Sequence, residues 1–275
     1  MPLSYCSVYA MIKHPLRIAD KHNAERCYFI MPRTKTVVIL CALFLACGHF
    51  ASAEQSFSPG ERITYSIKKY GVRVGKATLI FHGLIQRGSR KLLLIEFNAT
   101  SLNFLDREEI YADPRTFFPV MVKRDLNIWG KKEQIIEYYD AQAGKVTIEK
   151  HAGSSVTQEI IKHDYPLENI YCFLYKFRAA KTFPPKTAVR LNLPTAQVLL
   201  KVRERTSIRM AGKRHQAFFL QSQSKEYRLW FADDQRRTPL RIDGAIGLGS
   251  ASLMMTSYHA ASHQRLANQM GGSHE

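Results

Sequence analysis

The sequence predicts a mainly β protein: a single domain of antiparallel meander strands, curled into a barrel or half-barrel, with one main α-helix at about 165–180. Apolar and polar residues alternate with period two through most of the chain after residue 60, as they do in strands with one buried face. Turn residues interrupt the alternation about every 8 to 12 residues, which is typical of a meander that curls into a barrel. Only one segment has the spacing of a helix.

The first strand is predicted from Ile63, because Ile63, Tyr65 and Ile67 fall on one face and polar residues fall on the other. A second strand follows at 76–82, after the glycines at 71 and 75. The same pattern predicts further strands at 92–99, 105–111, 120–128, 133–139, 145–150, 189–193, 198–205, 215–221, 227–231, 240–243 and 246–254.

The helix is predicted from apolar residues that recur at helical spacing, with Asp164 as its cap and Pro166 in its first turn. These apolar residues are Leu167, Ile170, Tyr171, Leu174 and Phe177. The helix ends before Phe183 and the two prolines that follow it. Its apolar face needs a partner, and the concave side of a curved sheet offers one.

The N-terminal region has the three parts of a secretory signal peptide at 31–53: a basic start, an apolar run at 36–47 and the exit Ala51-Ser52-Ala53. Cleavage near Ala53-Glu54 places the product in the periplasm. One alternative is a retained membrane anchor through about 36–53, although this run is shorter than a bilayer span requires. Another is a lipoprotein, since the sequence before Cys47 loosely resembles a lipobox.

Residues 1–30 precede the signal peptide and are mixed and polar, so we interpret them as an upstream mis-start or a disordered stretch, with translation from Met31. The β-domain then spans 54–258, and 259–275 is predicted to be a flexible tail that includes the histidines at 259 and 263. No metal site or cofactor is expected, because these histidines lack further ligands and the cysteines have no C-x-x-C spacing.

Composition excludes a disordered protein and a disulfide-stabilised one. The chain is 45% hydrophobic and 23% charged, which is enough apolar residue to build a core and argues against disorder. Four of the five cysteines lie in residues 1–53, so the exported chain keeps only Cys172 and forms no internal disulfide. Cys172 stands in an apolar run and is interpreted as a buried small hydrophobe.

The chain is strongly basic, with 40 Lys and Arg against 23 Asp and Glu and a net charge of +17, which falls to +13 without residues 1–53. One basic series is interleaved with apolar residues: Lys201, Arg203, Arg205, Arg209, Lys213 and Arg214. It has three interpretations, namely the solvated face of a sheet, a site for anionic head groups or polysaccharide, and a nucleic-acid surface. Nucleic acid is not expected as a partner of an exported protein.

Carboxylates offer the only candidates for acid–base chemistry, and no residue is assigned as catalytic. Asp233 and Asp234 follow an aromatic strand and precede Pro239, an arrangement that suits a hairpin turn and, as an alternative, an acid catalyst or a cation site. Asp106 and Glu108 fall on one strand face and carry the same ambiguity. No G-x-S-x-G motif or phosphate-binding loop is present.

Three blocks of sequence resemble an uncharacterised proteobacterial envelope family, the domain of unknown function 3108. The segment from Phe57 to Ala77 resembles its F-x-P-G-E-x-L-x-Y…G-x-x-x-G-x-A start. Asp164 to Arg178 is similar to its D-x-x-S-x-x-Y-x-x-R helix, with Asn169 near the usual Ser, and Leu229 to Ile242 is similar to its V-W-x-S-D-D…P-V-R-I block. The resemblance covers about 57–255 and implies a signal peptide, a periplasmic location and a curved antiparallel sheet, but no reaction.

Candidate ligand-binding residues lie in these blocks: Trp230, Asp233, Asp234, Tyr175 and Arg178. We expect a non-enzymatic binding or carrier module for a lipid or lipidated envelope component, with a basic rim that meets anionic head groups or polysaccharide. A structural or partner-binding protein with a filled core is the alternative. A hydrolase of envelope glycan or lipid that uses Asp233 or Asp234 is a third hypothesis.

Overall fold

A computed structural model describes residues 56–180, 186–224, 226–246 and 249–260, and these residues form one helix and fifteen strands. The helix is α1 (Ile170–Ala179). The strands are β1 (Glu61–Lys69), β2 (Val72–Arg87), β3 (Arg90–Ser101), β4 (Phe104–Ala112), β5 (Pro119–Ile128), β6 (Lys131–Asp140), β7 (Lys145–Ala152), β8 (Ser155–Lys162), β9 (Ala188–Leu193), β10 (Ala196–Val202), β11 (Thr206–Met210), β12 (Lys213–Ser222), β13 (Arg228–Ala232), β14 (Pro239–Ile246) and β15 (Gly249–His259).

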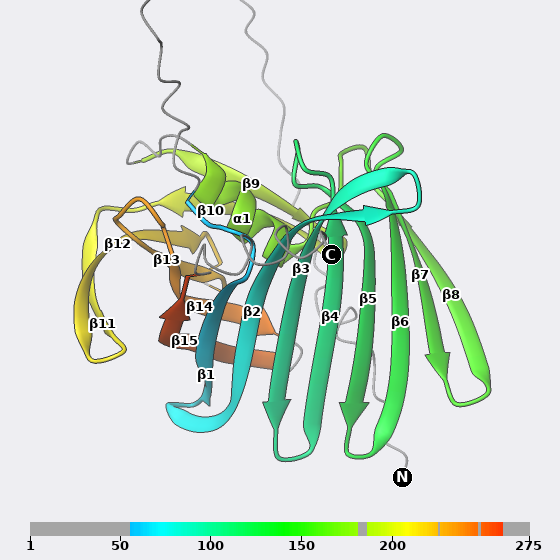
Figure 1. Cartoon of the computed structure of the whole chain (residues 1–275), viewed down its shortest axis with the longest axis horizontal. Coiled ribbons are helices and arrows are strands. Elements are labelled where there is room, and N and C mark those ends of the chain that lie inside the picture. Colours follow the sequence, from blue (N-terminus) through cyan, green and yellow to red (C-terminus); the bar gives the residue numbers. More distant parts are fainter. Residues whose placement is uncertain (1–55, 181–185, 225, 247–248, 261–275) are drawn as a thin grey trace, which may run out of the picture.

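All fifteen strands belong to one antiparallel sheet, which curls without closing and confirms the predicted mainly β half-barrel (Figure 1). Strands β1 to β8 are neighbours in chain order, as expected for a meander. Strand β1 then pairs with β15, so the beginning and the end of the domain lie against each other and the order continues through β14, β13, β12 and β10 to β9. Strand β11 lies off this path and pairs with β12.

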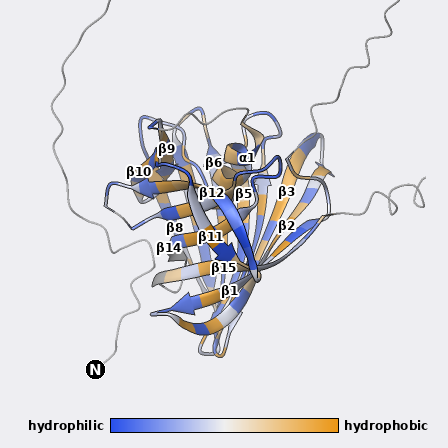
Figure 2. Cartoon of the chain, turned by 90° about the vertical axis from the view of Figure 1, so that its left-hand side faces the viewer, coloured by the Kyte–Doolittle hydropathy of each residue, from blue (hydrophilic) through white to orange (hydrophobic). Residues whose placement is uncertain are grey.

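Alternation along the strands supplies the core, and it is visible as alternating colours along the ribbons in Figure 2. In β1, for example, Ile63, Tyr65 and Ile67 are all buried, as predicted. These side chains join counterparts on other strands and the helix in the main apolar cluster, and smaller clusters lie at β6–β7 and on the outer face at Leu92, Tyr111 and Met121. Removal of this apolar surface from water is the main term that stabilises the fold.

Helix α1 packs against β3, β4 and β9 (Figure 1). Its aromatic side chains belong to the main apolar cluster. Tyr171, Phe173, Tyr175 and Phe177 are each at most 6% exposed. Tyr171 stacks on Phe97 of β3 with ring centroids 4.4 Å apart. The helix therefore fills space on the inner side of the sheet, where the sequence placed its partner.

The helix begins later than predicted. Asn169, rather than Asp164, is the N-cap, because its side-chain oxygen accepts hydrogen bonds from the backbone nitrogens of Tyr171 (2.8 Å) and Cys172 (3.4 Å). The preceding segment 163–168 instead runs beside β9, where the Pro166 carbonyl accepts a hydrogen bond from the side chain of Asn192. Pairing with β9 thus prevents these residues from joining the helix.

Two strands were not predicted as separate elements. Strand β8 was missed because seven of its eight residues are exposed and it lacks the apolar alternation of a half-buried strand. The predicted strand at 198–205 corresponds to β10, which ends at Val202, and no strand was predicted at the position of β11. Both β10 and β11 pair with β12, one after the other along its length.

The predicted signal peptide at 31–53, the stretch 1–30 and most of the predicted tail at 259–275 lie outside the described residues. Within the described part, no helix has the length and apolar character needed to cross a bilayer. Cys172 is buried as predicted, and burial raises the pKa of its thiol.

Candidate functional site

An ion pair in the core joins two of the sequence blocks. Arg178 lies in the last turn of α1, and Glu61 is the first residue of β1. The guanidinium donates to both carboxylate oxygens, at 2.5 Å and 2.7 Å, and also to the carbonyls of Ser56 (2.9 Å) and Arg236 (3.0 Å). Neither side chain of the pair is exposed to solvent.

Aromatic rings enclose this pair. The guanidinium carbon lies 5.0 Å from the ring centre of Phe57 and 5.2 Å from that of Tyr175. The Tyr258 hydroxyl donates to Glu61 at 2.9 Å, and burial together with the Glu61 charge raises the pKa of Tyr258 to about 12. Arg178 and Tyr175 therefore occupy the core, where they join the N-terminal segment, the helix and the loop before β14.

The spacing of the helix motif explains the sequence of α1. When D-x-x-S-x-x-Y-x-x-R is aligned on Tyr175 and Arg178, its Asp falls on Asn169 and its Ser falls on Cys172. This corrects the alignment that began the motif at Asp164 and set Asn169 near the Ser. Asp and Asn are both good N-caps, and Asn169 is the N-cap here. The motif thus encodes the start of the helix and the buried arginine near its end.

The two adjacent aspartates form the turn between β13 and β14. One carboxylate oxygen of Asp234 accepts from the backbone nitrogens of Arg236 (3.0 Å) and Arg237 (2.9 Å), as in an Asx turn. The Arg237 side chain donates to the carbonyl of Ala180, so the turn is tied to the end of the helix. Asp233 pairs with Arg205 at 2.9 Å.

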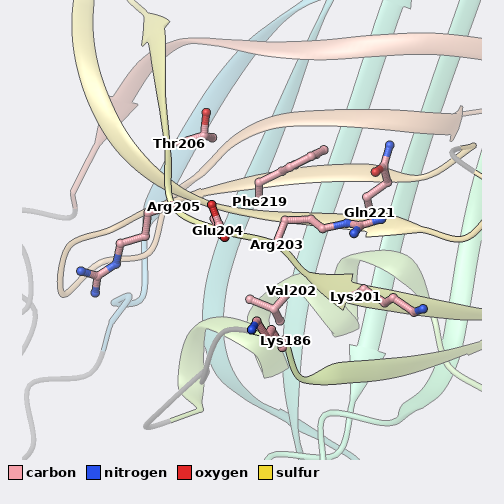
Figure 3. Close-up of a pocket in the computed structure, with 9 residues that line it drawn as sticks. All are labelled: Lys186, Lys201, Val202, Arg203, Glu204, Arg205, Thr206, Phe219 and Gln221. Carbon is pink, nitrogen blue, oxygen red and sulfur yellow. The ribbon is translucent and has the colours of Figure 1, made fainter.

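An open hollow of about 690 Å³ lies on the surface formed by β10, β12 and the β10–β11 connection (Figure 3). Its lining residues are Lys186, Lys201, Val202, Arg203, Glu204, Arg205, Thr206, Phe219 and Gln221. We call this set the basic groove. In Figure 3 the Arg203 side chain extends toward Gln221, whereas Arg205 points away on the opposite side.

The charges of the basic groove are largely unbalanced. Of its four cations, Arg205 has a carboxylate partner in Asp233. For Lys186, Lys201 and Arg203, the described part of the chain provides no carboxylate within ion-pair distance. Glu204 is the single acid of the lining. The groove therefore has a net positive charge that faces solvent.

Trp230 adjoins this groove through Phe219. The two residues are cross-strand partners, and their rings stack with centroids 4.6 Å apart. On the other side of Trp230, its cross-strand partner is Arg241 of β14, whose guanidinium lies 4.7 Å from the centre of the Trp230 ring. Of the five candidate ligand-binding residues, Trp230 and Asp233 thus lie beside the groove, Asp234 shapes a turn, and Tyr175 and Arg178 are in the core.

A second polar cluster lies on the inner face of β4, β5 and β6. Arg124 binds both carboxylate oxygens of Asp106, at 2.7 Å and 2.5 Å, and lies 3.6 Å from Glu108. Glu137 of β6 faces the same cluster and accepts from Tyr139 at 2.6 Å. Burial raises the pKa of Glu108 to about 8, and the charges of Asp106 and Glu137 add to this effect while Arg124 opposes it.

Sequence analysis placed Asp106 and Glu108 on one face but missed Arg124 and Glu137. The alternation of their strands could have placed both residues on the inner face. Arg124 stands between the buried Val122 and Leu126, and Glu137 stands two residues after the buried Ile135. Among the described residues, no group of three His, Cys, Asp or Glu side chains is arranged to hold a metal ion.

A cavity that the described residues line beside the helix is small. A cavity lined by Tyr171, Tyr227, Ile242 and Leu253, among others, has a volume of about 20 Å³. This is room for one water molecule and not for an acyl chain. The inner side of the sheet at this point is therefore packed rather than hollow.

These features define a class of protein, an open antiparallel half-barrel that is packed by a single helix and carries a basic groove on its surface. Residues 62–256 match the family described as "Protein of unknown function (DUF3108)", and the chain belongs to that family. No curated protein matches it.

Three solved structures are similar to the chain at low identity. A β-barrel-like protein of the domain of unknown function DUF1849 from Brucella abortus has a TM-score of 0.43 at 8% identity, covering 75% of this chain and 99% of that one. A candidate lipoprotein from Parabacteroides distasonis has a TM-score of 0.27 at 8% identity, with coverage of 74% and 98%. A candidate exported protein with a YmcC-like fold from Bacteroides fragilis has a TM-score of 0.26 at 7% identity, with coverage of 74% and 97%.

Proposed function

We propose that the protein is an extracytoplasmic, non-enzymatic binding module that holds an anionic component of the cell envelope in the basic groove. The observation that carries the proposal is that Lys186, Lys201 and Arg203 line one hollow without carboxylate partners in the described chain. Like charges that are gathered in this way repel one another, and an anionic ligand would relieve the repulsion.

Phosphate-bearing lipid head groups suit the groove best. Cations at a lipid surface are usually accompanied by amphipathic and aromatic side chains, which enter the interface between head groups and acyl chains. Phe219 lines the groove, Trp230 stacks on it, and Leu199 of β10 is 38% exposed two residues before Lys201. The signal peptide expected at 31–53, with cleavage near Ala53-Glu54, would deliver the domain to such a surface.

A carrier function with the ligand inside the curved sheet is the second hypothesis, and the packing of α1 bears on it. An acyl chain on the inner side would have to displace the aromatic side chains of the helix, which are at most 6% exposed. Burial of large aromatic side chains is worth several kcal/mol, so displacement is costly. A lipid that co-purifies with the protein, identified by mass spectrometry, would favour the carrier.

A hydrolase built on Asp233 or Asp234 has less support. The carboxylate of Asp234 is occupied by two backbone N–H groups, and that of Asp233 by Arg205. Replacement of both by Asn is expected to affect the turn rather than any turnover.

The proposed function is tested by co-sedimentation of the protein with vesicles. We expect binding to vesicles of phosphatidylglycerol and phosphatidylcholine, little binding to phosphatidylcholine alone, and a decrease as NaCl is raised. The double variant Lys201→Glu/Arg203→Glu should weaken binding at least tenfold. The matched control is Arg90→Glu/Lys91→Glu, an equal charge change at two exposed positions of the β2–β3 hairpin.

Equal losses in the two variants would mean that the overall charge, and not the groove, attracts the vesicles, and this would overturn the proposal. Failure to bind anionic vesicles, with tight binding to a soluble acidic polysaccharide such as alginate that is lost in Lys201→Glu/Arg203→Glu, would keep the groove and replace the head group by a glycan.

A further inference from the structure

Strand β8 ends the sheet with an open edge. Seven of its eight residues are exposed, and the pairing of β8 with β7 runs in regular register without a bulge. The strand contains no proline. Val156 and Ile160 are 62% and 60% exposed. An edge strand that is regular and carries exposed apolar side chains is a template for pairing with another strand.

The opposite end of the sheet is protected. The backbone of Asn192 in β9 is bonded on its free edge by Glu168, whose N–H donates to the Asn192 carbonyl at 2.6 Å and whose carboxylate accepts from the Asn192 nitrogen at 3.0 Å. The Pro166 carbonyl accepts from the Asn192 side chain, and His163 lies 3.2 Å from the Pro194 carbonyl. The chain thus covers one edge of the sheet with its own segment 163–168, whereas no described segment pairs with the outer edge of β8.

We propose that β8 is a dimerisation strand, which pairs in antiparallel fashion with β8 of a second copy of this chain about a two-fold axis at Gln158. This register is self-complementary. It places Val156 opposite Ile160 twice on the outer face and Thr157 opposite Glu159 twice on the inner face. The register also sets Gln158 opposite Gln158 at the axis and Ser155 opposite Ile161 twice on the inner face.

Neighbouring registers are less favourable. Opposite residues of an antiparallel pair lie on the same face of the sheet, so the two-fold axis must pass through a residue and not between two residues. The neighbouring registers therefore have their axes at Glu159 and at Thr157. An axis at Glu159 would set two carboxylates against each other and place Val156 opposite Lys162. An axis at Thr157 would place Val156 opposite Gln158 and Ser155 opposite Glu159, with no apolar pair.

The dimer would also extend a row of mainly apolar residues on the outer face of the sheet. Six successive cross-strand partners from β3 to β8 form this row: Leu94, Tyr111, Met121, Tyr138, Thr147 and Ile160. In the proposed register the next position is Val156 of the second copy. Ile160, which ends the row, and Val156 of the second copy are exposed in the monomer and would pack against each other in the dimer.

Disulfide trapping tests the register, in the full chain with Cys6, Cys27, Cys41 and Cys47 replaced by Ser. Gln158→Cys would place two thiols at the axis with Cα atoms about 4.5–5.5 Å apart, within the range of a disulfide. Ser155→Cys is the matched control, because the two copies of this exposed position would lie about 20 Å apart. We expect a covalent dimer for Gln158→Cys and none for Ser155→Cys on a non-reducing gel.

Sedimentation equilibrium tests the interface without a cross-link. Val156→Lys should weaken self-association at least tenfold, whereas Val72→Lys, at a position that is 66% exposed on β2, should leave it unchanged. Equal cross-linking at 155 and 158, a monomer at 100 μM, or capture at position 158 of a different protein with no homodimer would each overturn the proposal. The vesicle assay is independent of this outcome, because the basic groove lies on β10, β12 and the β10–β11 connection, away from β8.

Discussion

Glu61 and Arg178 are 117 residues apart in the chain and form an ion pair with two hydrogen bonds and no exposed surface. Removal of one partner of such a pair leaves a buried charge without compensation. Glu61→Gln is therefore expected to lower the free energy of unfolding by about 3–5 kcal/mol, measured by urea denaturation. Arg178→Lys keeps the charge but loses the forked geometry, and should be destabilising as well.

Arg62→Gln is the control for this prediction, because Arg62 is the exposed neighbour of Glu61 and its loss should change stability by no more than about 0.5 kcal/mol. A loss below about 1 kcal/mol in Glu61→Gln would mean that the pair does not join the helix to β1 in the way described.

The buried Glu108 makes stability depend on pH. Its pKa is raised from 4.5 to about 8, so between these values the folded protein holds a proton that the unfolded chain has released. Stability must then fall as pH rises from 5 to 8, with a slope of up to about 1.4 kcal/mol per pH unit. Glu108→Gln, which cannot titrate, should flatten this dependence in urea denaturation at several pH values. Glu226→Gln, at an exposed position, should not; parallel pH profiles for wild type and Glu108→Gln would refute the prediction.

The start of the helix can be checked by truncation of its cap. Asn169→Ala removes the acceptor for two backbone N–H groups and is expected to cost about 1 kcal/mol, whereas Asn169→Asp should cost little. Asp164→Ala serves as the control, since Asp164 is exposed and lies before the helix. Thermal denaturation followed by circular dichroism measures the difference. A larger loss in Asp164→Ala would place the cap where the sequence alone put it.

Two glycines with the same backbone conformation should respond differently to substitution. Gly144 and Gly153 both have φ of +60°, in the turns that begin and end β7. A Cβ atom at Gly144 would lie 2.2 Å from the His163 carbonyl oxygen, whereas at Gly153 nothing lies within 4 Å. Gly153→Ala should cost only the strain of the left-handed region, about 1–2 kcal/mol. Gly144→Ala should cost about 1–3 kcal/mol more, and equal costs in urea denaturation would contradict the close approach of segment 163–168 to this turn.

Local pattern was sufficient for most of the fold. Period-two alternation predicted thirteen strand segments, and the helical spacing of Ile170, Tyr171, Leu174 and Phe177 predicted the one helix of the described residues. The failures have separate causes. Strand β8 carries little apolar alternation because both of its faces are exposed, and residues 164–168 were assigned to the helix because their pairing with Asn192 cannot be read locally.

The candidate site was predicted less completely, because its residues come from distant segments. The basic series from Lys201 to Arg205 was recognised, but Lys186 and Phe219 join it only through the pairing of β10 with β9 and β12. Likewise, alternation placed Asp106 and Glu108 on one face without revealing that Arg124 and Glu137 face them from the next strands.

The sequence by itself thus determined the class of fold, the buried face of most strands, the family and the basic character of the chain. These properties follow from the period and composition of short segments. The tertiary structure decided which charges meet. The same residue types yielded a neutralised pair at Glu61 and Arg178, a buried cluster around Arg124, and an unbalanced groove at Lys201 and Arg203. The reason is that a strand's alternation specifies the side on which a residue lies, while its partner is specified by sheet order and register, which join segments as far apart as β1 and β15.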